Sequence, residues 1–316
     1  MREVDMKILL VVDGSSYSET ATRTLKALRL PPRTEVTVMT VVPEHVFLGG
    51  ITFGKVRGAS TEKEAQHQKA MELIQGPIQE ISASKLEVKS LVRWGNPAEE
   101  ILKVAEEQGS SLIVMGAKGL TEPSSFRLGS VALTVMKHAR ASVLLVRPDI
   151  TTRASFGKGS IKRVLLATDG SKYSDMVAQF LLDLPLARNC EVIMMTALQS
   201  HLATWMKTPT LDLQTNQKLL AELQATEESE ARKIAVRSET QFQAKGYKTA
   251  SVVVRGEAAE SILASAKEYK PDILALGSKG LNGIESFLLG NVAERVARYA
   301  DCSVLIGRAS KYIKRR

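Results

Sequence analysis

The feature that most constrains the fold of this chain is an internal repeat that covers nearly its whole length. The stretch VVDGSSYSETATRTL begins at Val11, and ATDGSKYSDMVAQFL, which begins at Ala167, matches it. Further on, WGNPAEEILKVAEEQGSSLIVMGAKGL begins at Trp94 and is matched by RGEAAESILASAKEYKPDILALGSKGL, which begins at Arg255. This repeat is much longer than a solenoid unit, so it indicates two copies of one domain.

The register of the repeat shows where the two copies differ in length. Asp13 corresponds to Asp169, an offset of 156 residues, whereas Gly95 and Gly256 are 161 residues apart. The second copy therefore carries five additional residues. We expect them between the second and third strands of the domain.

The pattern of apolar residues predicts how strands and helices alternate in the first copy. Residues 6–13 form a near-continuous apolar run, which is typical of a strand buried on both faces. Asn96 and Pro97 have the residue types of a helix N-cap and first helical position, and Gly109 that of a helix end. We expect strands at 6–13, 34–42, 86–93, 111–116 and 142–147, and helices at 16–28, 61–83, 97–108 and 129–139.

This alternation predicts an α/β fold with two tandem, doubly wound parallel sheets of the Rossmann-like kind. We place the domains at residues 1–150 and 161–316. A linker at 151–160 lies within a stretch that contains Pro148, Ser155, Gly157 and Gly159.

Composition narrows the class of protein. Apolar residues make up 44% of the chain but aromatics only 5%, so the core must consist mainly of aliphatic side chains. The net charge of +9 is spread along the chain apart from the terminal KYIKRR, which argues against a nucleic-acid surface. No apolar run approaches the roughly 18–20 residues of a membrane span. We interpret the N-terminal apolar stretch as a first strand rather than a signal peptide. We expect Cys190 and Cys302 to be reduced thiols inside core strands. Both interpretations favour a cytoplasmic protein.

A spaced glycine pattern follows the fourth strand of each copy. In the first copy Gly116 and Gly119 are followed, after nine residues, by Gly129 and Ser130 at a helix start. A glycine at a strand end lets a ligand approach the backbone, and a helix start offers N–H groups and a favourable dipole to phosphate. Ser130 can cap the helix and offer its hydroxyl to a phosphate. The second copy repeats the pattern with Gly277, Gly280, Gly290 and Asn291.

Asp13 and Asp169 end the first strand of each copy, at the edge where ligands of open α/β sheets bind. A carboxylate there can hold a ribose hydroxyl or an adenine amino group. The alternative is that the glycines are ordinary turn residues, which a single short pattern would favour. Because the pattern occurs twice, each time with a DGS after the first strand, nucleotide binding is the better interpretation.

With these motifs, the chain resembles a tandem universal stress protein over nearly its whole length. The family pattern is Gly-x2-Gly-x9-Gly-Ser/Thr, preceded by an Asp after the first strand. The resemblance implies an adenine nucleotide alpha hydrolase-like fold that binds ATP. Because the sequence offers no carboxylate cluster beyond one Asp in each site, we expect any Mg²⁺ to be held mainly by the phosphates. In the first copy the resemblance implies that Asp13 meets the adenosine, Val41 the adenine and Gly116 the ribose, while the phosphates lie against Gly119, Gly129, Ser130 and Val131.

The resemblance extends to the second copy with one departure. Its matching residues are Asp169, Ala197, Gly277, Gly280, Gly290 and Val292. Asn291 stands where the family prefers Ser or Thr. Asn can still cap a helix, but its bulkier amide crowds a phosphate. The resemblance also implies that the two domains pair as a pseudo-dimer through their last strands.

Several residues near these motifs allow two interpretations, one functional and one purely structural. Lys118 and Lys279 can reach a γ-phosphate or be solvated loop lysines. His45 and His201 can each serve as a general base. The alternative is that they are surface residues left from the duplication and have no function. Arg127, whose counterpart is Leu288, suggests a surface role or a phosphate contact in one site only. Phe47, Phe53 and Trp205 can cover a site or an interface, or simply pack locally.

Three functions remain open on the sequence. The first is an ATP-binding regulatory stress protein with little or no turnover and an unknown protein partner, alone or as a homodimer. The second is a slow ATPase or nucleotide-transferring enzyme, although the chain has no Walker sequence, no HIGH-type motif and no Ser-Gly-Gly phosphate loop. The third is a dimerisation scaffold in which only the first copy binds nucleotide. We predict no catalytic residue and no protein-built metal site.

Overall fold

The structure is a computed structural model that describes residues 6–28, 30–31, 33–43, 59–84, 86–120, 127–148, 161–184, 186–198, 217–280 and 289–308. The expected linker, His45, His201 and the aromatic residues Phe47, Phe53 and Trp205 lie outside these ranges. Among the described residues, no helix is both long and apolar enough to cross a membrane.

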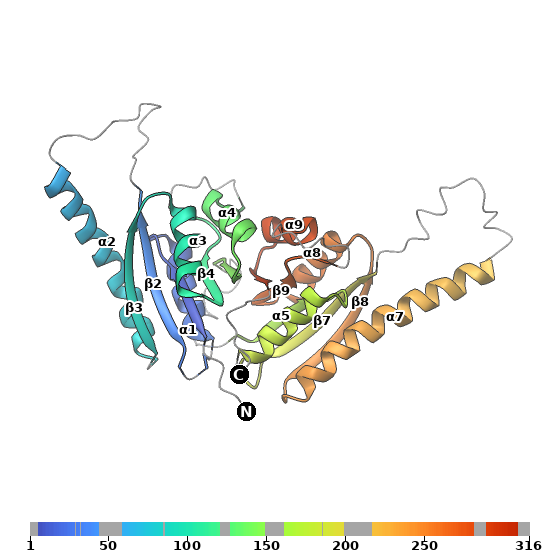
Figure 1. The fold of residues 1–316 in the computed structure, drawn as a ribbon. Coiled ribbons are helices and arrows are strands. Elements are labelled where there is room, and N and C mark those ends of the chain that lie inside the picture. Colours follow the sequence, from blue (N-terminus) through green and yellow to red (C-terminus); the bar gives the residue numbers. More distant parts are fainter. Residues whose placement is uncertain are drawn as a thin grey trace, which may run out of the picture.

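Both copies contain the predicted alternation of strands and helices (Figure 1). The strands of the first copy are β1 (Lys7–Val11), β2 (Glu35–Val42), β3 (Glu87–Trp94), β4 (Leu112–Gly116) and β5 (Ser142–Val146). Its helices are α1 (Ser16–Ala27), α2 (Ala59–Ser82), α3 (Pro97–Gln108) and α4 (Ser130–His138). The strands of the second copy are β6 (Arg163–Ala167), β7 (Glu191–Leu198), β8 (Lys248–Arg255), β9 (Ile273–Gly277) and β10 (Ser303–Gly307). Its helices are α5 (Lys172–Asp183), α7 (Gln217–Gln243), α8 (Ala258–Tyr269) and α9 (Asn291–Tyr299).

Local signals fix the ends of α3 as the sequence predicts. The Asn96 side chain accepts hydrogen bonds from the N–H groups of Ala98 at 3.0 Å and Glu99 at 3.3 Å. Gly109 ends the helix in the left-handed conformation, with φ of 66°, which glycine adopts at little cost. The predicted cap and the predicted helix end are therefore confirmed.

The strands form one ten-stranded sheet in the order β3-β2-β1-β4-β5-β10-β9-β6-β7-β8. Pairing is parallel within each copy, and β5 pairs with β10 antiparallel, with Leu144 opposite Leu305. The pairing of the last strands, which the resemblance implied, is confirmed within this chain. It joins the two expected sheets into one.

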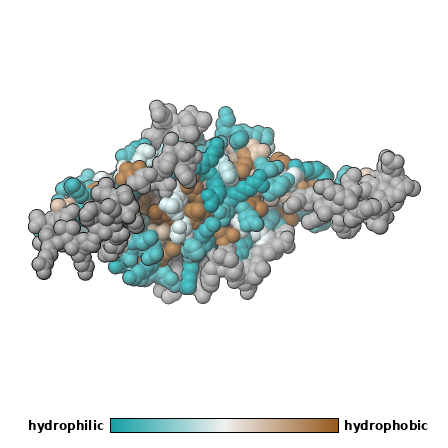
Figure 2. All heavy atoms as spheres, turned by 90° about the horizontal axis from the view of Figure 1, so that it is seen from above, coloured by the Kyte–Doolittle hydropathy of each residue, from teal (hydrophilic) through white to brown (hydrophobic). Residues whose placement is uncertain are grey.

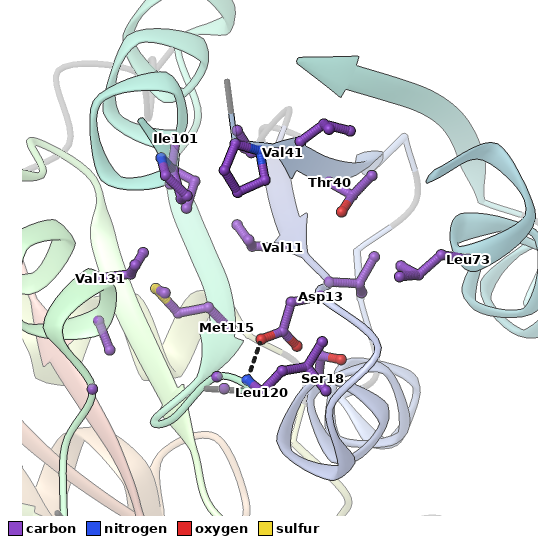
Figure 3. Close-up of a pocket in the computed structure, with 18 of the residues that line it drawn as sticks. Val11, Asp13, Ser18, Thr40, Val41, Leu73, Ile101, Met115, Leu120 and Val131 are labelled. Carbon is purple, nitrogen blue, oxygen red and sulfur yellow. Dashed lines mark hydrogen bonds between the residues drawn. The ribbon is translucent and has the colours of Figure 1, made fainter. Parts of the chain in front are cut away.

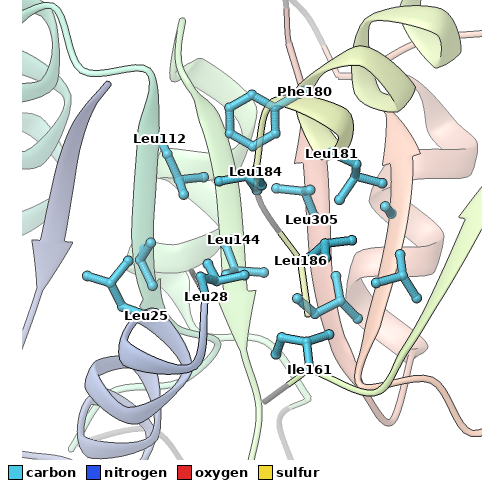
Figure 4. Close-up of a cluster of buried hydrophobic side chains, with 14 of the residues drawn as sticks. Leu25, Leu28, Leu112, Leu144, Ile161, Phe180, Leu181, Leu184, Leu186 and Leu305 are labelled. Atoms are coloured by element: carbon cyan, nitrogen blue, oxygen red, sulfur yellow. The ribbon is translucent and has the colours of Figure 1, made fainter. Parts of the chain in front are cut away.

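Two hydrophobic cores cover the two faces of this sheet, because successive strand residues point to opposite faces. Leu10 lies in the core under α1 and α2, whereas Leu9 lies in the core under α3 and α4. Both cores continue from one copy into the other. Figure 4 shows Leu144 of β5 close to Leu305 of β10, with side chains from α1 and α5 on either side.

Ion pairs between unlike positions add to this interface. Lys137 of α4 pairs with Glu294 of α9 at 3.1 Å, and Arg127 pairs with Asp301 at 3.0 Å. The repeat counterpart of Asp301 is Arg140, so the Arg127 pair could not form between two identical first copies. In the view from above, hydrophilic side chains gather along the middle of the molecule between patches of hydrophobic ones (Figure 2).

The placement of the two cysteines corrects the sequence prediction in one respect. Each lies directly before a strand, Cys190 before β7 and Cys302 before β10, rather than inside it. Both are free thiols, and burial raises the pKa of Cys190 to about 12 and that of Cys302 to about 11.

Candidate functional site

A cavity of about 440 Å³ lies at the carboxyl ends of β1, β2 and β4 in the first copy. The strand order changes direction between β1 and β4, since β2 and β3 lie on one side and β5 on the other. Open α/β sheets bind ligands at such a switch point. The cavity is lined by all seven residues of the first copy that the resemblance assigned to the nucleotide: Asp13, Val41, Gly116, Gly119, Gly129, Ser130 and Val131.

Asp13 lies in the middle of the cavity wall and connects three backbone segments (Figure 3). Its Oδ1 accepts hydrogen bonds from the Ser15 N–H at 3.0 Å and the Ser15 hydroxyl at 2.6 Å. Its Oδ2 accepts one from the N–H of Leu120 at 3.2 Å. Since Ser15 also caps α1, the carboxylate holds the end of β1, the start of α1 and the glycine loop together.

Close packing explains two of the glycines. A β-carbon on Gly116 would lie 2.7 Å from Cβ of Tyr17 and 2.9 Å from the carbonyl oxygen of Lys118. A β-carbon on Gly119 would lie 2.9 Å from Oδ2 of Asp13. Gly116 therefore lets α1 approach β4, and Gly119 lets the loop reach the carboxylate. The packing of the protein therefore requires glycine at both positions, whether or not a ligand also contacts them.

The start of α4 differs from the prediction. Gly129 occupies the N-cap position, with φ of −74° and ψ of 158°, and Ser130 is the first helical residue rather than the cap. Because glycine has no side chain to cap with, no side-chain hydrogen bond caps this helix. The first N–H groups of a helix lack partners within it, and the helix dipole adds partial positive charge there. This end of the cavity suits an anion.

The structure adds residues to the site that the sequence did not indicate. Gln66, Lys69 and Leu73 of α2 line the cavity on one side, and Ile101 of α3 lines it on the other. Apolar spacing predicts α2 as a helix but carries no information on which of its turns faces the end of the sheet. Lys118, singled out from the sequence, lines the same cavity.

The second copy reproduces much of this geometry. Oδ1 of Asp169 accepts a hydrogen bond from the N–H of Ser171 at 3.0 Å, and a β-carbon on Gly280 would lie 2.8 Å from Oδ2 of Asp169. Gly277 faces Tyr173 as Gly116 faces Tyr17, with 3.0 Å to an added β-carbon. Gly290 is the N-cap of α9 and Asn291 its first residue, so Asn291 is not the cap. Ala197 and Val292 are half-buried against the core under α8 and α9.

The wall formed by the long helix differs between the copies. Leu73 faces Gly14 as Ile234 faces Gly170, which sets the register between α2 and α7. In this register Gln66 and Lys69 of the first copy correspond to Glu227 and Glu230 of the second. The first copy thus has a neutral and a basic residue at these two positions, where the second has two acidic ones, of which Glu230 pairs with Lys233 at 2.7 Å.

Two buried polar atoms of the second copy have no hydrogen-bond partner among the described residues. Within the described ranges, Oγ1 of Thr196 and Oε2 of Glu227 are buried without a partner. Thr196 is only 3% exposed, and it corresponds to Thr40, which lines the first cavity. A polar group that is buried without a hydrogen bond costs free energy, which a ligand that bonds to it would recover.

Arg127 lies between the copies rather than among the phosphate-binding candidates. Its Nη1 donates to the carbonyl oxygen of Tyr299 at 3.2 Å and to Asp301 at 3.0 Å. In the second copy, Nζ of Lys279 lies 5.6 Å from the centre of the Tyr173 ring. In the part of the chain that the structure describes, no group of three His, Cys, Asp or Glu side chains could hold a metal ion.

Fold and site together define a class: tandem, doubly wound α/β proteins with a candidate ligand site at the switch point of the sheet. Residues 6–147 and 160–308 each match the universal stress protein family. The chain belongs to this family and carries two of its domains in tandem.

Individual relatives agree with this assignment. The chain is 29% identical over 153 residues to universal stress protein MJ0577 of Methanocaldococcus jannaschii, covering 45% of this chain and 94% of that protein. It is 32% identical over 107 residues to universal stress protein G of Shigella flexneri, covering 33% and 74%. A universal stress protein structure from Archaeoglobus fulgidus superposes with a TM-score of 0.61 at 20% identity, covering 96% of this chain and 98% of the other. The last comparison supports the fold alone.

Proposed function

We propose that this universal stress protein binds ATP in the first copy and responds to the nucleotide with little or no turnover. The observation that carries the proposal is the cavity in which Asp13, the glycine loop and the uncapped start of α4 meet. Its volume of about 440 Å³ lies within the range of small-molecule sites.

The residues around the cavity divide into a base end and a phosphate end. Val41 and Ile101 offer an apolar surface to the adenine, and Asp13 offers a carboxylate oxygen to the adenosine. Gly129, Ser130 and the first turn of α4 receive the phosphates, with Mg²⁺ held mainly by the phosphate oxygens.

The chemistry of the lining residues supports the low turnover that we propose. Among the described residues that line the cavity, Asp13 is the only carboxylate. Both of its oxygens already accept hydrogen bonds from Ser15 and Leu120. A carboxylate used in this way is a weak candidate for a general base that activates water. We therefore propose a role in which nucleotide state alters the surface offered to a protein partner.

A second candidate is a tandem protein in which only the first copy binds nucleotide. The acidic Glu227 and the bulkier Asn291 favour it, because they would repel or crowd a polyphosphate. In this case the second copy serves mainly as the pairing partner of the first through β5 and β10.

The test is to purify the protein without added nucleotide, denature it and quantify what is released by chromatography. Two ATP per chain support binding in both copies, and one supports the second candidate. In that case Asn291→Ser, with Ser130→Asn as the matched variant, locates the weak site. Release of ADP or AMP supports an enzyme instead. No release, together with no thermal shift in millimolar ATP, contradicts nucleotide binding.

A further inference from the structure

The two candidate phosphate-binding helices are each held at their far end by an arginine from the other copy. Nη2 of Arg147 donates a hydrogen bond to the carbonyl oxygen of Ala297 in α9 at 2.6 Å. Nη2 of Arg308 donates to the carbonyl oxygens of Met136 at 2.6 Å and Lys137 at 3.2 Å in α4. Each arginine thus contacts the last turn of the helix that starts at the opposite site.

The arrangement is reciprocal because the two arginines are repeat counterparts. Arg147 directly follows β5, and Arg308 directly follows β10. Their backbone N–H groups donate to the hydroxyls of Ser303 at 3.1 Å and Ser142 at 3.2 Å, the first residues of the opposite strands. Antiparallel pairing of the last strands therefore carries each arginine past the neighbouring strand to the end of the helix before it.

The arginines are largely buried, so their hydrogen bonds to these carbonyl oxygens matter for the stability of the structure. Arg147 is only 8% exposed, and its guanidinium also donates to the carbonyl oxygens of Arg127 and Cys302. A buried cation is costly unless it is compensated, and the last carbonyls of a helix carry partial negative charge. Burial lowers the pKa of both guanidinium groups, to about 10 for Arg308, which still leaves that group charged at neutral pH.

We propose that Arg147 and Arg308 are positioning residues for the nucleotide site of the opposite copy. This rests on the proposed function of the start of α4 and, if both copies bind, of α9. Each helix has nine residues and is therefore about 13 Å long, and the arginine contacts its last turn, at the end away from the phosphates. A short helix moves as a unit. Fixing its carboxyl end therefore fixes the direction of its first N–H groups.

The test crosses arginine variants with variants that leave one site intact. Asn291→Asp places a negative charge at the start of α9 and leaves the first site, while Ser130→Asp does the same at α4 and leaves the second. In the Asn291→Asp background, Arg308→Met should weaken ATP binding about tenfold by calorimetry, and by clearly more than Arg147→Met, whose contact near that site is a hydrogen bond to the carbonyl oxygen of Arg127. In the Ser130→Asp background the effects should exchange. Lysine at either position should bind ATP more tightly than methionine but less tightly than arginine, because it keeps the positive charge but not the several N–H donors of the guanidinium group.

A purely structural role for the arginines predicts a different result. Both arginine variants would then weaken either site equally, or neither would, and either outcome overturns the proposal. If the Asn291→Asp protein itself binds no ATP, the proposed function of the first site fails.

A readout without ligand keeps the positioning role testable in that event. Hydrogen exchange should increase in α4 but not in α9 for Arg308→Met, and in α9 but not in α4 for Arg147→Met. Unchanged exchange in the expected helix overturns the proposal whatever ATP does.

Discussion

Replacing Gly116 with alanine tests whether close packing, rather than only ligand access, requires a glycine at the end of β4. The added β-carbon would lie 2.7 Å from Cβ of Tyr17, 2.9 Å from the carbonyl oxygen of Lys118 and 3.2 Å from the carbonyl carbon of Tyr17. All three are backbone atoms or bonded directly to the backbone. None of them can move away by rotation of a side chain.

The expected cost follows from these distances. Carbon atoms pack best at about 3.5–4.0 Å, so α1 or the glycine loop must shift to accept the methyl group. Overpacking of this kind destabilises proteins by about 1–3 kcal/mol. For a domain of this size, a loss of about 2 kcal/mol lowers the melting temperature by roughly 4–8 °C.

The matched control is the same substitution three residues along, Gly119→Ala. Its β-carbon would meet only Oδ2 of Asp13, the end of a side chain that can rotate. We expect a smaller fall in melting temperature than for Gly116→Ala, because only the hydrogen bonds of Asp13 are disturbed, together with weaker ATP binding because Asp13 is displaced. Thermal unfolding followed by circular dichroism measures stability, and calorimetry measures ATP binding. A Gly116→Ala protein that melts no lower than Gly119→Ala would refute the packing argument.

Substitutions at Asn96, Cys190 and Lys69 test three other contacts. Asn96→Ala removes two hydrogen bonds at the start of α3 and should lower the free energy of unfolding by about 1 kcal/mol in urea, whereas Glu99→Ala, next to the cap, should cost less. Burial raises the pKa of Cys190 from 9.0 to about 12, so the unfolded chain loses this proton first and stability should fall as the pH rises from about 9 towards 12. Cys190→Ala should make that fall less steep, and an unchanged slope would contradict the burial argument. Lys69→Glu should weaken ATP binding at the first site about threefold and more at low salt, with Lys103→Glu on α3 as the control.

Local sequence patterns were enough to predict the duplication, the order of elements and the residues that gather at the first cavity. These properties depend on local patterns: apolar runs give buried strands, Asn96 and Gly109 mark the ends of a helix, and the DGS and glycine motifs follow strands. Because parallel strands of one sheet end at the same edge, motifs placed after β1 and β4 had to meet there.

The side chains from distant parts of the chain that complete and support the site could not be predicted in this way, because their positions depend on how whole elements pack. Lys69 lines the cavity because its helical turn of α2 lies next to the end of the sheet. Gly116 is required because α1 packs in contact with β4. Arg147 and Arg308 reach the opposite copy because β5 and β10 pair antiparallel in one register. These contacts join residues that are far apart in the chain, and their geometry is set by the packing of whole elements, which no local pattern encodes.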